Sequence, residues 1–136
     1  MSTIKVLGID LGKSSFHVIG RDYSDSIVCR KQFSRSKLIE YLANTPLCVV
    51  AFEACGGSHW LARQCEAIGH TVRLIPPQYV KPYVKGNKND FIDASAIAEA
   101  STRPGMRFVA VKSESAQIMA VCHRLRDAFV AERTAC

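Results

Sequence analysis

The segment near the start of the chain, Ile4-Lys5-Val6-Leu7-Gly8-Ile9-Asp10-Leu11-Gly12-Lys13, decides how the rest of the sequence is interpreted. A short apolar run that contains Ile and Val and is bounded by glycine predicts a buried β-strand. This strand ends in one carboxylate, that of Asp10. Because a buried ionised carboxylate must be paired or must coordinate a metal ion, Asp10 is either the cap of a strand turn or a ligand.

Two later segments carry carboxylates that are placed to join Asp10. The apolar run 47–52 predicts a strand buried on both faces, and it ends in Glu53 as the first strand ends in Asp10. A helical pattern begins at Asp90, where Asp90 and Asp93 are three residues apart and therefore share one face. We expect Asp10 to bridge two divalent ions, Glu53 to hold one of them, and Asp90 with Asp93 to hold the other. Mg2+ or Mn2+ is expected, because both ions prefer oxygen ligands.

The order of predicted elements indicates the fold. Three strands joined by short turns form a meander, and helices and strands then alternate in the order β-β-β-α-β-α-β-α. This order predicts an α/β domain with a mixed five-stranded sheet flanked by helices, the RNase H-like arrangement, with the first strand at its centre. The expected strands are 4–10, 14–20, 26–33, 47–52 and 71–75, and the expected helices begin near Ser34, Ser58, Asp90 and Ser113.

The composition fits a single domain that acts on a polyanion. The 136 residues include 18 Lys and Arg against 12 Asp and Glu, a net charge of +6. A basic surface around an acidic pocket suits a phosphodiester-handling enzyme, although an ordinary basic domain would have the same charge. No signal peptide or long apolar run occurs, and six cysteines form no Cys-x-x-Cys pair. We therefore expect reduced thiols, a cytoplasmic protein and no membrane contact.

Basic residues after the fifth strand predict a nucleic-acid surface. Lysines alternate there with Tyr79 and Tyr83, a combination that suits contact with phosphates and bases, although a solvated linker would have the same composition. A further lysine follows Asp10 closely enough to reach a phosphate bound there. The candidate nucleic-acid-binding residues are Lys13, Arg73, Lys81, Lys85 and Lys88.

Three segments together resemble a known family. Residues 8–13 (GIDLGK), 52–57 (FEACGG) and 88–94 (KNDFIDA) are similar to the three acidic motifs of the DEDD transposases of bacterial insertion sequences, which have the Piv-type DNA invertases as relatives. The resemblance covers nearly the whole chain, as the N-terminal RuvC-like domain of that family. It implies a catalytic, metal-binding tetrad of Asp10, Glu53, Asp90 and Asp93, and cleavage and exchange of DNA strands at transposon ends and target.

The resemblance also implies parts that lie outside these residues. Residues 1–112 would be the RuvC-like catalytic domain. Residues 113–136, with a heptad-like stripe of Ile118, Cys122, Leu125 and Phe129, would begin a long coiled-coil helix leading to a second domain. That domain would supply a nucleophilic serine, so this chain alone would be an incomplete recombinase. A guide RNA and a homo-oligomer of the full-length protein are further implications.

Three other functions are compatible with parts of the sequence. A RuvC-like or YqgF-like Holliday-junction nuclease would share the fold and the metal chemistry. An actin-like kinase or ATPase lobe would share the Gly-Ile-Asp-Leu-Gly segment, but it needs further glycine-rich phosphate motifs, and none is present. A non-catalytic nucleic-acid-binding module would retain its acidic residues for folding alone.

Overall fold

The structure is a computed structural model that describes residues 3–12, 14–86 and 89–135, with side chains described as far as residue 126. Five strands form one sheet in the order β3-β2-β1-β4-β5, in which β1 pairs antiparallel with β2 and parallel with β4. The elements are β1 (Val6–Leu11), β2 (Phe16–Arg21), β3 (Ile27–Phe33), α1 (Arg35–Ala43), β4 (Val49–Glu53), α2 (Ser58–Ile68), β5 (Thr71–Ile75), α3 (Pro77–Val80), η1 (Lys81–Tyr83), α4 (Asp90–Ser101) and α5 (Glu114–Ala135).

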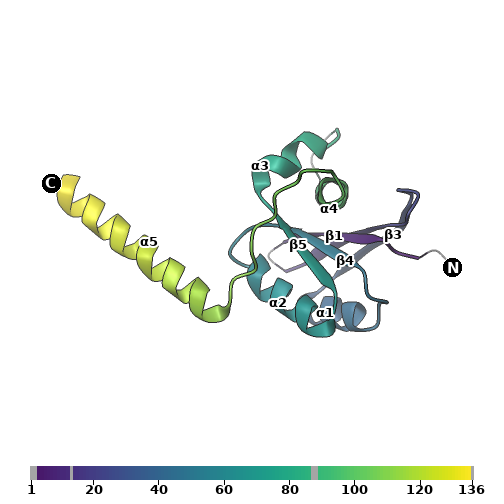
Figure 1. The fold of residues 1–136 in the computed structure, drawn as a ribbon, viewed down its shortest axis with the longest axis horizontal. Coiled ribbons are helices and arrows are strands. Elements are labelled where there is room, and N and C mark those ends of the chain that lie inside the picture. The colour runs from purple at the N-terminus through teal and green to yellow at the C-terminus, as the bar shows by residue number, and fades with distance from the viewer. Residues whose placement is uncertain (1–2, 13, 87–88, 136) are drawn as a thin grey trace.

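Helices cover both faces of the sheet, with α1 and α2 on one side and α3 and α4 on the other (Figure 1). Side chains alternate between the two faces along each strand, so Leu7 and Ile9 pack with the α1 and α2 cluster while Val6 packs with the α4 cluster. Asp10 follows Gly8 by two residues and Val6 by four, so the three residues share one face of the sheet. The Asp10 carboxylate therefore emerges on the face that α4 covers.

A glycine on β1 lets α4 approach the sheet closely. A Cβ atom on Gly8 would lie 2.7 Å from the amide nitrogen of Ala98 and would overlap the carbonyl oxygen of Ala94. Small residues on the facing side of α4 complete this contact, since Ala94 and Ala98 are fully buried. The close crossing fixes the depth at which the first turn of α4 lies over the sheet.

The predicted fold is confirmed, and the predicted elements occur in the expected order, with the short helices α3 and η1 between β5 and α4. Each observed strand begins or ends within two residues of its expected boundary, and the central position of β1 is as expected. Gly69 ends α2 in the left-handed conformation (φ 119°), as a C-terminal glycine should. Helix α2 begins at Ser58, as expected, with Gly57 as its N-cap, and the Ser58 hydroxyl donates a hydrogen bond to the Cys55 carbonyl.

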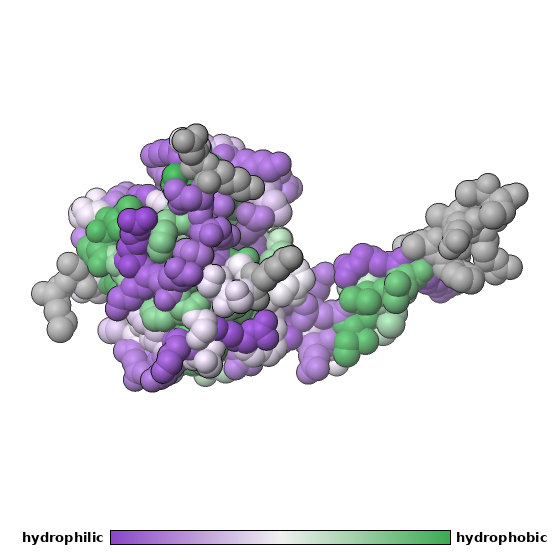
Figure 2. All heavy atoms as spheres, turned by 180° about the vertical axis from the view of Figure 1, so that it is seen from behind, coloured by the Kyte–Doolittle hydropathy of each residue, from purple (hydrophilic) through white to green (hydrophobic). Residues whose placement is uncertain are grey.

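The last helix extends away from the sheet (Figure 1). Gln117 anchors its first turns, because it accepts a hydrogen bond from Arg63 at 2.7 Å and donates one to the Gly56 carbonyl at 2.9 Å. Figure 2 shows an apolar band along this helix, formed by Ile118, Met119, Val121 and Leu125, which are exposed. Of the predicted heptad-like stripe, Ile118, Cys122 and Leu125 are exposed, and the Phe129 side chain lies outside the described residues. Pairing of this stripe as a coiled coil stays a prediction, as do the two domain boundaries. No helix in the described residues is long and apolar enough to cross a membrane.

Candidate metal centre

The carboxyl ends of β1 and β4 bring Asp10 and Glu53 together. The two strands are parallel neighbours, with Ile9 opposite Phe52, so the residue that follows each of them lies at the same edge of the sheet. Phe52 belongs to the core on the α1 and α2 side, and alternation therefore turns Glu53 to the α4 side, where Asp10 also points. Two predicted ligands thus come from the sheet itself.

The first turn of α4 brings the other two predicted carboxylates. Asn89 caps the helix by accepting a hydrogen bond from the Ile92 amide at 2.8 Å, which fixes the start of α4 at Asp90. Asp90 and Asp93 both lie in this turn. Because Gly8 allows the helix to cross β1 closely, both residues are near enough to act electrostatically on Asp10.

Asp10 lies between two groups of polar side chains. Toward β4, a cavity of about 330 Å³ contains three of the four carboxylates and one lysine; its lining residues are Asp10, Glu53, Pro77, Val80, Lys81, Val84 and Asp93. Toward β2, Asp10 lies near Asp90 and His17, and one ligand atom from each of these three residues falls within 4.8 Å of the others. Asp10 is the one acid common to both groups.

The electrostatics of the cluster favour a bound cation. Burial, followed by the negative charges of Asp93, Asp90 and Glu53, raises the pKa of Asp10 from 3.8 to about 6. Within the described residues, no Lys or Arg forms an ion pair with any of the four acids, and His17 alone approaches one of them. Hard oxygen donors that are not taken up in ion pairs with Lys or Arg are the ligand set that Mg2+ and Mn2+ prefer, so these residues fit divalent ions.

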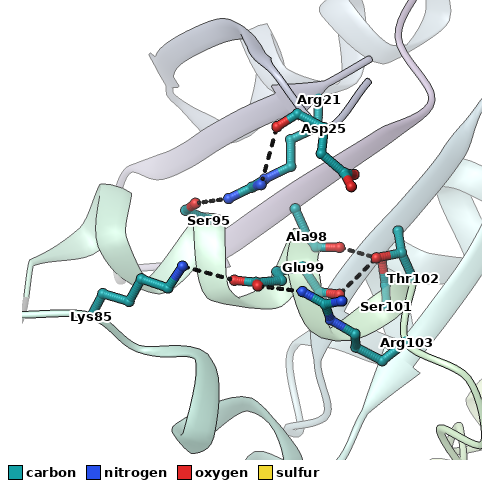
Figure 3. A network of polar contacts seen from close by, with 9 residues as sticks. All are labelled: Arg21, Asp25, Lys85, Ser95, Ala98, Glu99, Ser101, Thr102 and Arg103. Atoms are coloured by element: carbon teal, nitrogen blue, oxygen red, sulfur yellow. Dashed lines mark hydrogen bonds and ion pairs between the residues drawn. The ribbon is translucent and has the colours of Figure 1, made fainter. Parts of the chain in front are cut away.

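The predicted nucleic-acid-binding residues have different surroundings. Lys81 lines the acidic cavity. Arg73, which is half-buried, donates a hydrogen bond to the Ser101 carbonyl at 2.6 Å and lies over the Phe108 ring, so its guanidinium already has partners within the protein. Lys85 pairs with Glu99 of α4 at 3.8 Å (Figure 3). Lys13 and Lys88 lie outside the described residues.

His17 is not among the residues expected at this site from the sequence, yet it lies beside two of them. The only signal was the tight turn after β1, which the structure closes with a hydrogen bond from the Gly12 amide to the Ser15 carbonyl. That turn sets the antiparallel register in which Asp10 lies directly opposite His17. The imidazole is buried and lies 3.6 Å from the Asp90 carboxylate.

His59 is buried for a structural reason. Its Nδ1 accepts a hydrogen bond from the Lys112 amide at 3.1 Å, which ties the segment before α5 to α2. Burial and the nearby charges of Lys112 and Arg63 lower the pKa of His59. These contacts favour a neutral imidazole that holds the segment before α5 against α2.

The sheet order and the acidic edge define an RNase H-like domain, in which the central strand, its parallel neighbour and a crossing helix all contribute carboxylates. Comparison with known families gives a narrower result. The model of the DEDD_Tnp_IS110 family, described as "Transposase", matches residues 7–136. The chain therefore belongs to this transposase family.

Individual relatives agree with the family match. The chain is 50% identical over 133 residues to the transposase for insertion sequence element IS1328 of Yersinia enterocolitica, covering 98% of this chain and 40% of the relative. It is 50% identical over 129 residues (95% and 38%) to a probable family 20 transposase of Pseudomonas aeruginosa. It is 40% identical over 135 residues (99% and 37%) to the transposase for insertion sequence element IS1111A of Coxiella burnetii. The chain spans no more than two fifths of the length of these relatives.

Proposed function

We propose that this chain is the metal-binding catalytic domain of a transposase and that it supports divalent-metal-dependent cleavage and exchange of DNA strands. The observation that supports the proposal most strongly is the convergence of four carboxylates from three separate segments. In the described residues, none of these four acids forms an ion pair with arginine or lysine. Burial, followed by the charges of Asp93, Asp90 and Glu53, raises the pKa of Asp10 to about 6. A fold that needed these acids only for stability would gain nothing from such mutual repulsion.

The residues have distinct roles in this proposal. Asp10 would supply oxygen ligands to both ions, and Glu53 with Asp93 would hold the ion that faces the cavity. This division differs from the one expected from the sequence, which grouped Asp93 with Asp90. Two ions held by these residues would stabilise the attacking and leaving oxygens of an in-line phosphodiester displacement. The ammonium group of Lys81, on the same cavity wall, attracts a phosphate of the DNA toward these acids.

The proposal extends to partners of the longer protein. Strand exchange uses a serine nucleophile of a second domain, outside these 136 residues, and α5 leads toward that domain. A structured RNA guides the choice of DNA, and the full-length protein acts as a homo-oligomer. Resemblance to the family supports these points, so they are tested on the full-length protein.

Calorimetric titration with Mn2+ and Mg2+, with and without a branched DNA, tests the core of the proposal. We expect saturable binding that the DNA strengthens and that Asp10→Asn and Asp93→Asn weaken by at least about tenfold, the loss typical of altered metal sites. Asp25→Asn is the matched control, because this exposed turn residue has φ 63°, a conformation that asparagine also adopts. Binding that is absent under every condition, with equally stable variants, would make the acids structural.

A further inference from the structure

His17 on β2 faces the acids of the metal centre. In the antiparallel register of β1 and β2 it lies directly opposite Asp10, so the two side chains emerge on the same face of the sheet at a typical Cβ separation of about 5 Å. The imidazole Nε2 lies 3.6 Å from Oδ2 of Asp90 on α4. His17 thus approaches one acid of the sheet and one acid of the helix.

The His17 ring is buried, and it forms no hydrogen bond with any residue that the structure describes. His17 is 9% exposed, and Nδ1 has no hydrogen-bonding partner among the described residues. The distance from Nε2 to Asp90 is too long for a hydrogen bond. A phenylalanine could fill the same space without burying an unpaired nitrogen, so packing alone does not account for a histidine here.

Aromatic contacts hold the imidazole in place. The Phe91 ring, next to Asp90 in the first turn of α4, meets His17 edge to face with a centroid separation of 4.8 Å and an interplanar angle of 88°. The Arg30 guanidinium of β3 covers Phe91, with its carbon 4.3 Å from the ring centroid. The turn that carries Asp90 therefore also orients His17, which is how a ligand is preorganised.

The spacing of the donor atoms suits one ion. Ligand atoms of Asp10, His17 and Asp90 all lie within 4.8 Å of one another. Two donor atoms that bind one ion at about 2.1 Å each are roughly 3 to 4.2 Å apart. A small rotation of the exposed Asp90 side chain would bring the three ligand atoms within this separation. This position is on the β2 side of Asp10, away from the cavity that Glu53 and Asp93 line.

We propose that His17 Nε2 ligates a divalent ion together with Asp10 and Asp90. This inference rests on the proposed metal-dependent function and assigns Asp90 to a different ion from Asp93. An imidazole ligand suits transition ions, whereas carboxylate and water suit Mg2+. The β2-side position therefore prefers Mn2+ to Mg2+, while the cavity position, with oxygen donors only, discriminates less.

Pulsed electron paramagnetic resonance of the Mn2+-loaded chain tests the assignment, since nitrogen modulation of the Mn2+ echo reports a bound imidazole. We expect this modulation in the unchanged chain and its loss in His17→Phe, which keeps the aromatic packing, and in His17→Gln. Calorimetry should show that one Mn2+ site weakens by at least about tenfold in both variants, with a smaller loss of Mg2+ affinity. His123→Gln is the control, because His123 is exposed on α5 and its loss should leave the modulation unchanged.

The outcomes separate this inference from the function on which it rests. Mn2+ binding that depends on Asp10 and Asp93 but gives no nitrogen modulation, or modulation that persists in His17→Phe, would overturn the role of His17 and leave the transposase proposal intact. An absence of Mn2+ binding, with and without branched DNA, would overturn both. Circular dichroism of each variant shows that the fold is retained, and His17→Gln gives a second reading if His17→Phe is unstable.

Discussion

Gly8 of β1 lies in direct backbone contact with Ala94 of α4, and no side chain of any size fits between them. A Cβ atom on Gly8 would overlap the Ala94 carbonyl oxygen and lie 2.8 Å from the Ala98 Cβ. The first turn of α4 carries Asp90 and Asp93, so this contact sets how deeply their carboxylates reach toward Asp10. Helix packing and the geometry of the candidate site are thereby linked.

Replacement of Gly8 by alanine should damage both stability and metal binding. We expect Gly8→Ala to lower the free energy of unfolding by about 1–3 kcal/mol, the usual cost of overpacking, because α4 must move away from β1. The same movement separates Asp93 from Asp10, so Mn2+ affinity should also fall. Denaturant unfolding and calorimetry measure the two effects.

Gly57→Ala is the matched control for this substitution. A Cβ atom on Gly57 meets nothing within 4 Å, and its φ of −76° suits any residue. This variant should keep its stability and its Mn2+ affinity. Equal losses in both glycine variants would contradict the role given to the contact between β1 and α4.

Asp10→Asn should stabilise the metal-free protein at neutral and alkaline pH. Burial and three neighbouring acids raise the folded-state pKa of Asp10 to about 6, above its value in the unfolded chain. The free energy of unfolding therefore falls as the pH rises from the unfolded-state pKa to the folded-state pKa. Asparagine removes this penalty. In EDTA, the midpoint of thermal unfolding at pH 8 should be higher for Asp10→Asn, and the difference should shrink toward pH 4. Added Mn2+ should reverse the order, because it stabilises only the chain that binds it.

Asp22→Asn should give the opposite sign in the same series. Hydrogen bonds from Ser24 and Ser26 lower the pKa of this exposed carboxyl, so its contribution to stability is present at neutral pH and is lost as pH falls. Asp22→Asn should therefore unfold at a lower temperature than the unchanged chain at pH 8, and the difference should vanish in acid. A shift of the same sign for both aspartates would refute the electrostatic account of Asp10.

The sequence predicts the fold well because each strand is a short apolar run with a clear end. The parallel pairing of β1 with β4 follows from two buried runs that both finish in an acid, and the start of α4 follows from Asn89 and Asp90. The close packing at Gly8 cannot be predicted from such runs. It depends on which residues of α4 meet the sheet, and that is decided only when the chain folds.

Polar contacts between distant residues were the least predictable part. A run of lysines and tyrosines indicates a basic surface, but it does not show that Glu99, on the next helix, pairs with Lys85. His17 was missed for a related reason. Its position beside Asp10 depends on the register of a hairpin, and a shift of one residue would have turned it to the opposite face.

Glu99 should hold the segment before α4 against the helix. Its side chain is 14% exposed and pairs with Arg103 at 2.5 Å and with Lys85 at 3.8 Å (Figure 3). We expect Glu99→Gln to lower the free energy of unfolding by about 1 kcal/mol, a modest figure because both cations are largely exposed. Amide hydrogen exchange should become faster in residues 81–86.

Glu40→Gln provides the comparison for that variant. Glu40 pairs with Lys37 one turn away on α1, and both side chains are exposed, so the pair contributes little. We expect its loss to change neither stability nor exchange in residues 81–86. Identical behaviour of the two glutamate variants would show that the buried position of Glu99 has no special effect.

Lys81→Met and Arg73→Met should separate a contact with nucleic acid from a contact within the protein. Lys81 lines the acidic cavity, so its loss should weaken binding to DNA of any sequence and reduce the slope of log affinity against log salt by about 1. Arg73 donates to the Ser101 carbonyl at 2.6 Å and stacks on Phe108, so its loss should lower the free energy of unfolding by about 1–2 kcal/mol and leave the salt slope unchanged. Fluorescence anisotropy at several salt concentrations, with denaturant unfolding beside it, measures both. A changed slope for Arg73→Met with unchanged stability would mean that Arg73 leaves Ser101 to bind phosphate.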